Sequence, residues 1–397
     1  MGSEPCPKSV LVLCGDYMED YEVIVPCYVL RAFRVRVDCV SPGKRAGDKC
    51  LTAVHDFHGF ELYTELPGHL FEINATLDSI QLESYDALII PGGRFTETLS
   101  ADDDVVRLVK RFAETGRPIA TSCHSQLMLV AAGLLSGGKL CTAFPSLKPV
   151  IEMAGGKWWS RNPGSTELDI FACVMDGNLL STIGWPAYGE YMNFLIRSIG
   201  GEITRNGNKS VLFLIGDYVE DHEINVPFRA MESLGCKVDT VSPSKKKGET
   251  CVTAIHDHDD DGSQICSEKR GHNFAITANW GEIRADDYDC VVVPGGRSPE
   301  LLVMNPSALS LVKEFQEKGK VVGAIGQGVW LLAAAGILKG RRCSGSNGLK
   351  AMVKAVGGEF NSSECTIDRN LVTAKEWPSL PAFVSELCNL LEVSVIF

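Results

Sequence analysis

An internal duplication with a period of about 200 residues constrains this chain more than any other feature. Residues 9–22 (SVLVLCGDYMEDYE) recur as residues 210–223 (SVLFLIGDYVEDHE), and PGGR at 91–94 recurs at 294–297. Such a period is far longer than that of a solenoid repeat. The chain is therefore predicted to contain two tandem domains of one kind.

The boundary between the two copies is predicted from composition. The stretch 200–209 is polar and rich in Gly and Asn, as linkers commonly are. We expect a first domain over 5–199 and a second over 208–397. In a chain of 397 residues, each domain is long enough to bury its own core.

Within each copy, short β-branched runs alternate with helical patterns. In the first copy, strands are predicted over residues 10–13, 35–40, 87–90 and 118–121, and helices over 21–33, 103–115 and 125–135. This alternation predicts two flavodoxin-like or Rossmann-like α/β sandwich domains with mostly parallel sheets. Functional groups of such sheets gather beyond the C-terminal ends of the strands.

Charge and cysteine usage exclude some classes of function. The formal net charge of −12 argues against nucleic acid or an anionic membrane surface as the partner. No apolar run resembles a signal peptide or a membrane span. Fifteen cysteines, an odd number, lie mostly in apolar stretches, which is typical of free thiols in a reducing compartment. We expect a cytoplasmic protein, with the nucleus equally compatible.

Three strand ends of the first copy carry candidate functional groups. Glu19 follows the first strand, Gly93 lies in the Pro-Gly-Gly after the third, and the fourth runs into Cys123-His124. A cysteine between a strand and a helix sits on a sharp turn, where the helix N-terminus favours the thiolate. The amides of Gly93 and His124 can stabilise an oxyanion, each typically by about 3–4 kcal/mol. The pattern predicts a reactive-cysteine site.

Each of these features also has a structural explanation. A single cysteine at a strand end is often buried filler, and Pro-Gly-Gly is a common turn. Glu19 and Asp20 can simply complement a helix N-terminus. Their joint occurrence at three ends of one sheet favours the site.

The motifs GDYMED, PGG (91–93) and SCHSQ (122–126) together resemble the DJ-1/PfpI family of the class I glutamine amidotransferase-like superfamily. The resemblance covers residues 5–397, and the tandem arrangement is similar to the plant DJ-1 homologues.

The resemblance implies roles for the candidate residues. Cys123 would be the nucleophile or the oxidation-sensitive thiol, and a protonated Glu19 would hydrogen-bond its sulfur. The backbone amides of Gly93 and His124 would form the oxyanion hole. The implied function is a role in oxidative and carbonyl stress, with a glyoxalase III-type hydro-lyase activity that turns methylglyoxal into lactate. It implies no cofactor and no metal, a small α-oxoaldehyde or peroxide as partner, and a homo-oligomer.

The sequence departs from the family in two places. Gly326 stands opposite Cys123 in the second copy, which keeps the turn and lacks a nucleophile. A histidine that active tandem relatives carry near the end of each domain is replaced by Tyr188 and Leu380. A missing proton shuttle typically costs a factor of about 10²–10⁴ in rate, so weak turnover is expected.

Two other functions remain open at this point. Cys123 can serve a non-catalytic redox sensor or protein-binding chaperone module, in which it is oxidised to a sulfinate. A cysteine peptidase or amidase is the weaker alternative, because adjacent residues on a tight turn rarely align an imidazole with the sulfur.

Two patterns suggest metals and are given structural interpretations. Residues 257–268 match a calcium-loop pattern but lack flanking helices, so we expect a solvated acidic loop. Histidines recur in both copies without a convergent Cys/His spacing, which favours structural roles. They are His55 and His69 in the first copy and His256 and His272 in the second.

Overall fold

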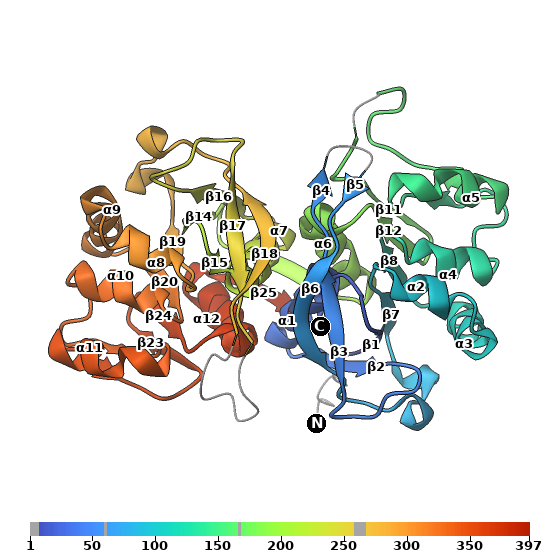
Figure 1. Ribbon diagram of the computed structural model, residues 1–397, viewed down its shortest axis with the longest axis horizontal. Helices are drawn as coiled ribbons and strands as arrows, with labels where there is room; N and C mark the ends of the chain where they lie inside the picture. The colour runs from blue at the N-terminus through green and yellow to red at the C-terminus, as the bar shows by residue number, and fades with distance from the viewer. Residues whose placement is uncertain (1–7, 59–61, 166–167, 258–266) are drawn as a thin grey trace. The chain divides into compact units, whose positions relative to one another are not determined.

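The computed structural model describes residues 8–58, 62–165, 168–257 and 267–397. It divides into two units, one formed by Met1–Glu202 with Val395–Phe397 and the other by Ile203–Ser394. The last three residues thus group with the first unit. The predicted fold class is confirmed in each unit (Figure 1).

The first unit is built on a six-stranded sheet. Its strands, in spatial order, are β11 (Cys173–Asp176), β12 (Leu179–Thr182), β8 (Ile119–Ser122), β7 (Ala87–Ile90), β1 (Ser9–Leu13) and β2 (Arg36–Val40). All neighbours are parallel except β11 and β12. The central strands are buried along their whole length, because both faces of the sheet are covered.

Helices form a layer on each face of this sheet (Figure 1). One layer contains α1 (Asp20–Ala32), which packs against α6 (Tyr188–Ser198). The other contains α2 (Phe95–Leu99), α3 (Asp103–Glu114) and α4 (Gln126–Ala131). The helix predicted over 125–135 is shorter in the structure, because Gly133 adopts a left-handed conformation with φ +68° and ends it.

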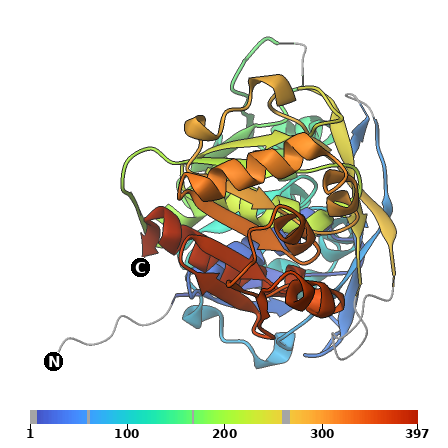
Figure 2. The ribbon, with the colours of Figure 1, turned by 90° about the vertical axis from the view of Figure 1, so that its left-hand side faces the viewer.

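The second unit repeats this arrangement. Its sheet has the order β16 (Lys237–Val241), β14 (Ser210–Leu214), β19 (Cys290–Val293), β20 (Val321–Ile325), β24 (Leu371–Ala374) and β23 (Cys365–Asp368). One helix layer contains α7 (Asp221–Ser233) and α12 (Leu380–Leu391). The other contains α8 (Ser298–Leu302), α9 (Pro306–Glu317) and α10 (Gly328–Ala334), coloured orange and turned toward the viewer in Figure 2.

Shorter elements surround the two sheets. Those of the first unit are β3 (Lys49–Val54), β4 (Phe57–His58), β5 (Leu62–Tyr63), β6 (Leu66–Glu72), β9 (Leu140–Cys141), α5 (Lys148–Met153) and β10 (Lys157–Trp158). Those of the second are β15 (Val219–Glu220), β17 (Thr250–Ile255), β18 (Lys269–Ala275), β21 (Arg342–Cys343), α11 (Lys350–Ala355) and β22 (Glu359–Phe360). Within the predicted linker, β13 (Glu202–Arg205) pairs with β25 (Val393–Ile396).

Candidate active site

Cys123 occupies a strained turn between β8 and α4. Its φ is +55°, in the left-handed region that residues with a side chain rarely adopt. The turn is held by the Cys123 N–H, which donates to the carbonyl of Thr182 (3.0 Å), and by Ser125 Oγ, which accepts from the Ser122 N–H (2.8 Å). Strain of this kind, typically about 1–3 kcal/mol, is often found at functional sites. The sharp turn predicted from the sequence is present.

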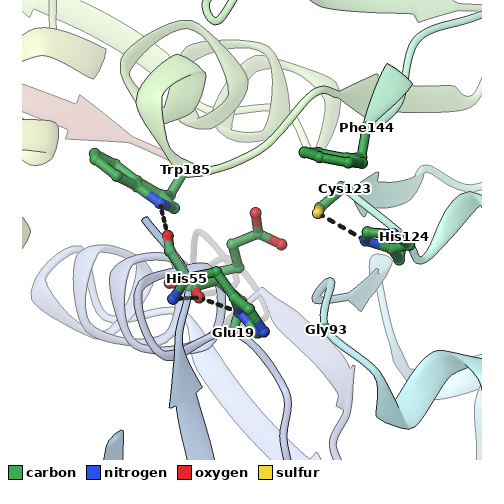
Figure 3. Close-up of a pocket in the computed structure, with 8 residues that line it drawn as sticks. Glu19, His55, Gly93, Cys123, His124, Phe144 and Trp185 are labelled. Carbon is green, nitrogen blue, oxygen red and sulfur yellow. Dashed lines mark hydrogen bonds and ion pairs between the residues drawn. The ribbon is translucent and has the colours of Figure 1, made fainter. Parts of the chain in front are cut away.

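A pocket surrounds this cysteine (Figure 3). The four residues predicted as the site, Cys123, Glu19, Gly93 and His124, all line it. Sequence reasoning missed the other lining residues, which are Glu22, His55, Phe144 and Trp185.

Glu22 is the buried acid of the pocket. Its Oε2 accepts hydrogen bonds from the Gly92 N–H (2.7 Å) and from Ser122 Oγ (2.6 Å). Burial, and secondarily the charge of Glu19, raise the pKa of the Glu22 carboxyl to about 8. The carboxyl is therefore mostly neutral at pH 7. Because Oε2 already accepts two donors, we assign the proton to Oε1.

Glu19 has a different set of partners. Its side chain caps α1 by accepting from the Tyr21 N–H (3.1 Å), which is the structural role the sequence left open. Its Oε2 also contacts two atoms of His55, the backbone N (3.0 Å) and the ring Nδ1 (2.7 Å; Figure 3). The hydrogen bond from Glu19 to the sulfur stays a prediction.

A signal for Glu22 existed in the sequence, since this residue recurs as Glu223 in the second copy.

Burial opposes the thiolate that the sequence predicted for Cys123. Burial raises the pKa of the Cys123 thiol well above its usual value, and the charges of Glu22 and Glu19 raise it further. The backbone N–H groups of His124 and Gly93 act in the opposite direction. The α4 helix has six residues and begins only at Gln126, so its N-terminus lowers the pKa of the thiol by less than burial raises it. Both amides thus contact the sulfur, and the oxyanion hole that they were predicted to form stays a prediction.

His124 reaches the sulfur in spite of the tight turn. Its Nδ1 lies 3.1 Å from Cys123 Sγ, and its ring stacks on Phe144 at 5.1 Å (Figure 3). The ring is thus within hydrogen-bond distance of the sulfur, in a turn where the sequence indicated that such an arrangement is rare. Burial, with the charges of His55 and Arg94, lowers the pKa of His124 to about 4. The ring is neutral at pH 7 and can accept the thiol proton.

Tyr188, at the position where active relatives are expected to carry a histidine, lies beside the acid. Its hydroxyl lies 2.9 Å from Ser122 Oγ and 3.2 Å from the backbone carbonyl of Glu22. Burial raises the pKa of the Tyr188 hydroxyl, so it remains protonated. Tyr188 therefore helps to fix the chain Tyr188–Ser122–Glu22.

The second unit keeps the same framework around Gly326. This glycine has φ +52°, close to the value at Cys123. Glu223 accepts from the Gly295 N–H at 2.7 Å, and burial raises the pKa of this carboxyl to about 8. A Cβ atom added to Gly326 would lie 3.1 Å from Glu223 Oε1. The turn without a nucleophile, expected from the sequence, is present.

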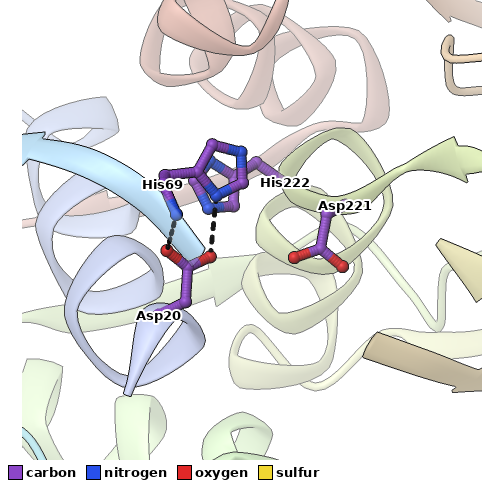
Figure 4. Close-up of side chains that lie close together, drawn as sticks. All are labelled: Asp20, His69, Asp221 and His222. Atoms are coloured by element: carbon purple, nitrogen blue, oxygen red, sulfur yellow. Dashed lines mark hydrogen bonds and ion pairs between the residues drawn. The ribbon is translucent and has the colours of Figure 1, made fainter. Parts of the chain in front are cut away.

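The recurring histidine pairs have different surroundings. His69 Nδ1 lies 3.0 Å from Asp20 Oδ2 (Figure 4), and His272 Nδ1 lies 3.0 Å from Asp221 Oδ2. These buried contacts fit the structural role predicted for both histidines. His55, by contrast, lines the pocket. Residues 258–266 of the calcium-loop pattern lie outside the described residues.

Comparison with known proteins agrees with the motifs. The chain matches the DJ-1/PfpI family model over residues 8–198 and 209–390. It is 58% identical over 393 residues to DJ-1 protein homolog E of Arabidopsis thaliana, covering 98% of both chains. It is 47% identical over 394 residues to protein DJ-1 homolog D of the same plant, covering 98% of this chain and 99% of the homolog. A deglycase of Thermococcus kodakarensis is 30% identical over 181 residues, which are 46% of this chain and 98% of that protein.

Proposed function

The chain belongs to the DJ-1/PfpI family, and from that premise we propose that it is a cofactor-free enzyme of carbonyl stress that converts small α-oxoaldehydes into 2-hydroxy acids at Cys123. One observation carries the proposal. Cys123 Sγ lies 3.1 Å from a neutral imidazole, in a pocket that also contains a carboxyl group protonated at pH 7. A base, a nucleophile and an acid thus meet at one point.

The first step is addition of the thiol to the aldehyde carbon. His124 Nδ1 takes the thiol proton as the S–C bond forms. Complete transfer of this proton before the bond forms is unfavourable, because the pKa of the thiol is raised and the pKa of the imidazole is lowered. Glu22 gives its proton to the aldehyde oxygen, and the amides of Gly93 and His124 stabilise the developing charge. The product is a hemithioacetal on Cys123.

The later steps need no external oxidant or reductant, because the substrate rearranges internally between C1, the former aldehyde carbon, and C2, the former ketone carbon. The Glu22 carboxylate takes the C1 proton, the ketone oxygen takes the proton held by His124, and an enediol forms. Glu22 returns a proton to C2, and His124 takes the proton of the C1 hydroxyl as a thioester forms. Water then attacks the thioester and gives one proton to Glu22. The departing sulfur takes the proton back from His124, which releases the 2-hydroxy acid.

We expect this activity to be slow. The base is weak, because its pKa is about 4, and Tyr188 supplies no imidazole. The second unit has Gly326 in place of the thiol and adds no turnover of this kind.

The test is lactate production from methylglyoxal by the purified full-length protein. Lactate formation that is lost in Cys123→Ser supports the proposal, and equal lactate from both proteins removes it. Since several archaeal relatives are named deglycases, a second reaction should start from preformed methylglyoxal adducts of N-acetylarginine. Release of lactate faster than the adduct's spontaneous decay would extend the activity to deglycation.

A redox-sensor function is favoured by the same pocket. Cys123 is only half-buried, and a sulfinate on it would accept hydrogen bonds from Glu22 Oε1 and the two amides. Mild peroxide should add two oxygens to the protein, and Cys123→Ala should abolish this addition in intact-mass spectra. Oxidation spread over many cysteines would contradict it.

The cellular setting is also a proposal. Among the residues that the structure describes, no helix has the length and apolar character needed to cross a bilayer. A cytoplasmic, homo-oligomeric protein that meets small α-oxoaldehydes or peroxide remains our expectation.

A further inference from the structure

A second concave surface of the first unit lies outside the Cys123 pocket. It is a groove with a volume of about 790 Å³ between α5, β10 and the loop that follows β10. The lining residues that matter here are Thr142, Lys148, Glu152, Trp158 and Trp159. The segment that carries Thr142 continues to Phe144, which lines the Cys123 pocket, so the two sites share a wall.

A buried hydroxyl group of this groove lacks a partner. Thr142 is fully buried, and its Oγ1 has no hydrogen bond among the described residues. The backbone around it is fixed, because its N–H donates to Ser181 Oγ (3.1 Å) and its carbonyl accepts from Gln126 Nε2 (2.8 Å). A buried hydroxyl without a partner costs free energy that a bound ligand can recover.

The second unit resolves the equivalent position differently. Strands β9 and β21 correspond with an offset of 202 residues, so Ser344 is the counterpart of Thr142. Ser344 Oγ lies 2.6 Å from Thr366 Oγ1 and is satisfied within the fold. The unpartnered hydroxyl therefore belongs to the unit that carries Cys123.

The loop that borders the groove is also particular to that unit. Fourteen residues separate Trp158 from Cys173, whereas four separate Phe360 from Cys365. The Arg161 N–H at the start of the longer loop donates to Asp169 Oδ2 (3.1 Å), and its guanidinium pairs with Glu190 on α6. These contacts tie Arg161, near the start of the loop, to Asp169 and to α6.

The lining has the chemistry of a carbohydrate site. A sugar ring has an apolar C–H face, which fits the indole of Trp159, and an edge of hydroxyl groups, which fits Glu152 as acceptor and Lys148 as donor. A cationic side chain fits less well, because Lys148 Nζ already lies 6.0 Å from the Trp158 ring centroid. The volume of about 790 Å³ is within the usual range of ligand pockets. We propose that this groove binds a short oligosaccharide.

The test is titration of the full-length protein with cellobiose and maltotriose, followed by tryptophan fluorescence and calorimetry. Saturable binding is expected for at least one of these sugars. Trp159→Ala should weaken it at least about tenfold, and Thr142→Val about three- to tenfold, the usual effect of one hydrogen bond. The valine variant should melt no lower than the wild type, because the hydroxyl it removes has no hydrogen-bond partner in the part of the chain that the structure describes.

Matched controls come from the second unit. Asn361→Ala and Ser344→Ala, the counterparts of the two variants, should leave sugar binding unchanged. Cys123→Ser should also bind normally, so that loss of lactate production and loss of sugar binding are separate outcomes. The proposal fails if neither sugar binds at about 10 mM. It also fails if binding survives Trp159→Ala, or if a proline-rich peptide occupies the groove while sugars do not.

Discussion

Ser122 Oγ lies 2.6 Å from Glu22 Oε2, and this contact determines where the proton of the buried acid resides. The same oxygen accepts from the Gly92 N–H, so the other oxygen is the one that can carry a proton. Burial keeps the carboxyl neutral near pH 7. Glu22 is therefore well placed to donate a proton in the pocket, the role that the sequence predicted for Glu19.

Replacing the acid tests this assignment. Glu22→Gln keeps an oxygen that can accept from Gly92 and Ser122 but removes the transferable proton, so lactate formation should fall by about 10²–10⁴. Glu19→Gln, a matched change on the same helix turn, should stay within about tenfold of the wild-type rate and mainly lower the melting temperature, because Glu19 caps α1. Equal kcat/KM losses in the two variants would contradict the assignment.

The pH dependence of the rate follows from two groups. Catalysis needs Glu22 protonated and His124 neutral, and the pKa values of these groups are about 8 and about 4. The kcat/KM for methylglyoxal should therefore be level between these values and decline above about pH 8. A profile that rises steadily through pH 9 would show that thiol ionisation governs the rate instead.

Stability should also depend on the same carboxyl. The folded-state pKa of Glu22 is raised from 4.5 to about 8, so the folded protein holds a proton that the unfolded chain releases across this interval. Stability from this group is present below about pH 4.5 and is lost as the pH rises toward 8, by at most about 1.4 kcal/mol per pH unit. The melting temperature of the wild type, relative to Glu22→Gln, should fall between pH 5 and pH 8. Parallel curves would contradict this.

A thiol placed in the second unit should find a formed site. In a Cys123→Ala background, Gly326→Cys would put its Cβ 3.1 Å from Glu223 Oε1, which requires only a small shift of that side chain. We expect a new thiol that maleimide labels faster than the buried cysteines. Adding Gln327→His should increase the labelling rate further, since a base would then lie beside the sulfur. No labelling of either variant in the folded protein would show that the framework around Gly326 is closed.

Gly92 lies between Glu22 and Cys123, and there is no space at this position for a side chain. A Cβ atom there would lie 2.5 Å from both Cys123 Cβ and Glu22 Oε2. Gly92→Ala should displace both groups and reduce lactate formation at least about tenfold, whereas Gly281→Ala, at a glycine with open space around it, should not. An active Gly92→Ala protein would mean that the spacing of acid and thiol is not critical.

The sequence predicted the scaffold well because it depends on patterns along the chain. The strand over 87–90 was predicted residue for residue, since a buried parallel strand reads as an unbroken apolar run. The sequence also indicated where Cys123 turns, because a strand end followed directly by a helix leaves few alternatives.

The chemistry of the site was harder to predict because it depends on burial and on side-chain torsions. Glu22 falls in the first turn of the helix predicted over 21–33, and nothing local in the sequence reveals that α1 is buried on nearly all sides. Burial also acts against the ionisation that was expected of Cys123, because it raises the pKa of the thiol. The contact between His124 Nδ1 and the sulfur depends on rotamers that spacing does not encode.

The shared backbone at Cys123 and Gly326 has a consequence for folding. A left-handed conformation typically costs a residue with a side chain about 1–2 kcal/mol that glycine avoids. The first unit therefore carries a conformational strain at Cys123 that the second unit, with glycine at the same turn, does not have.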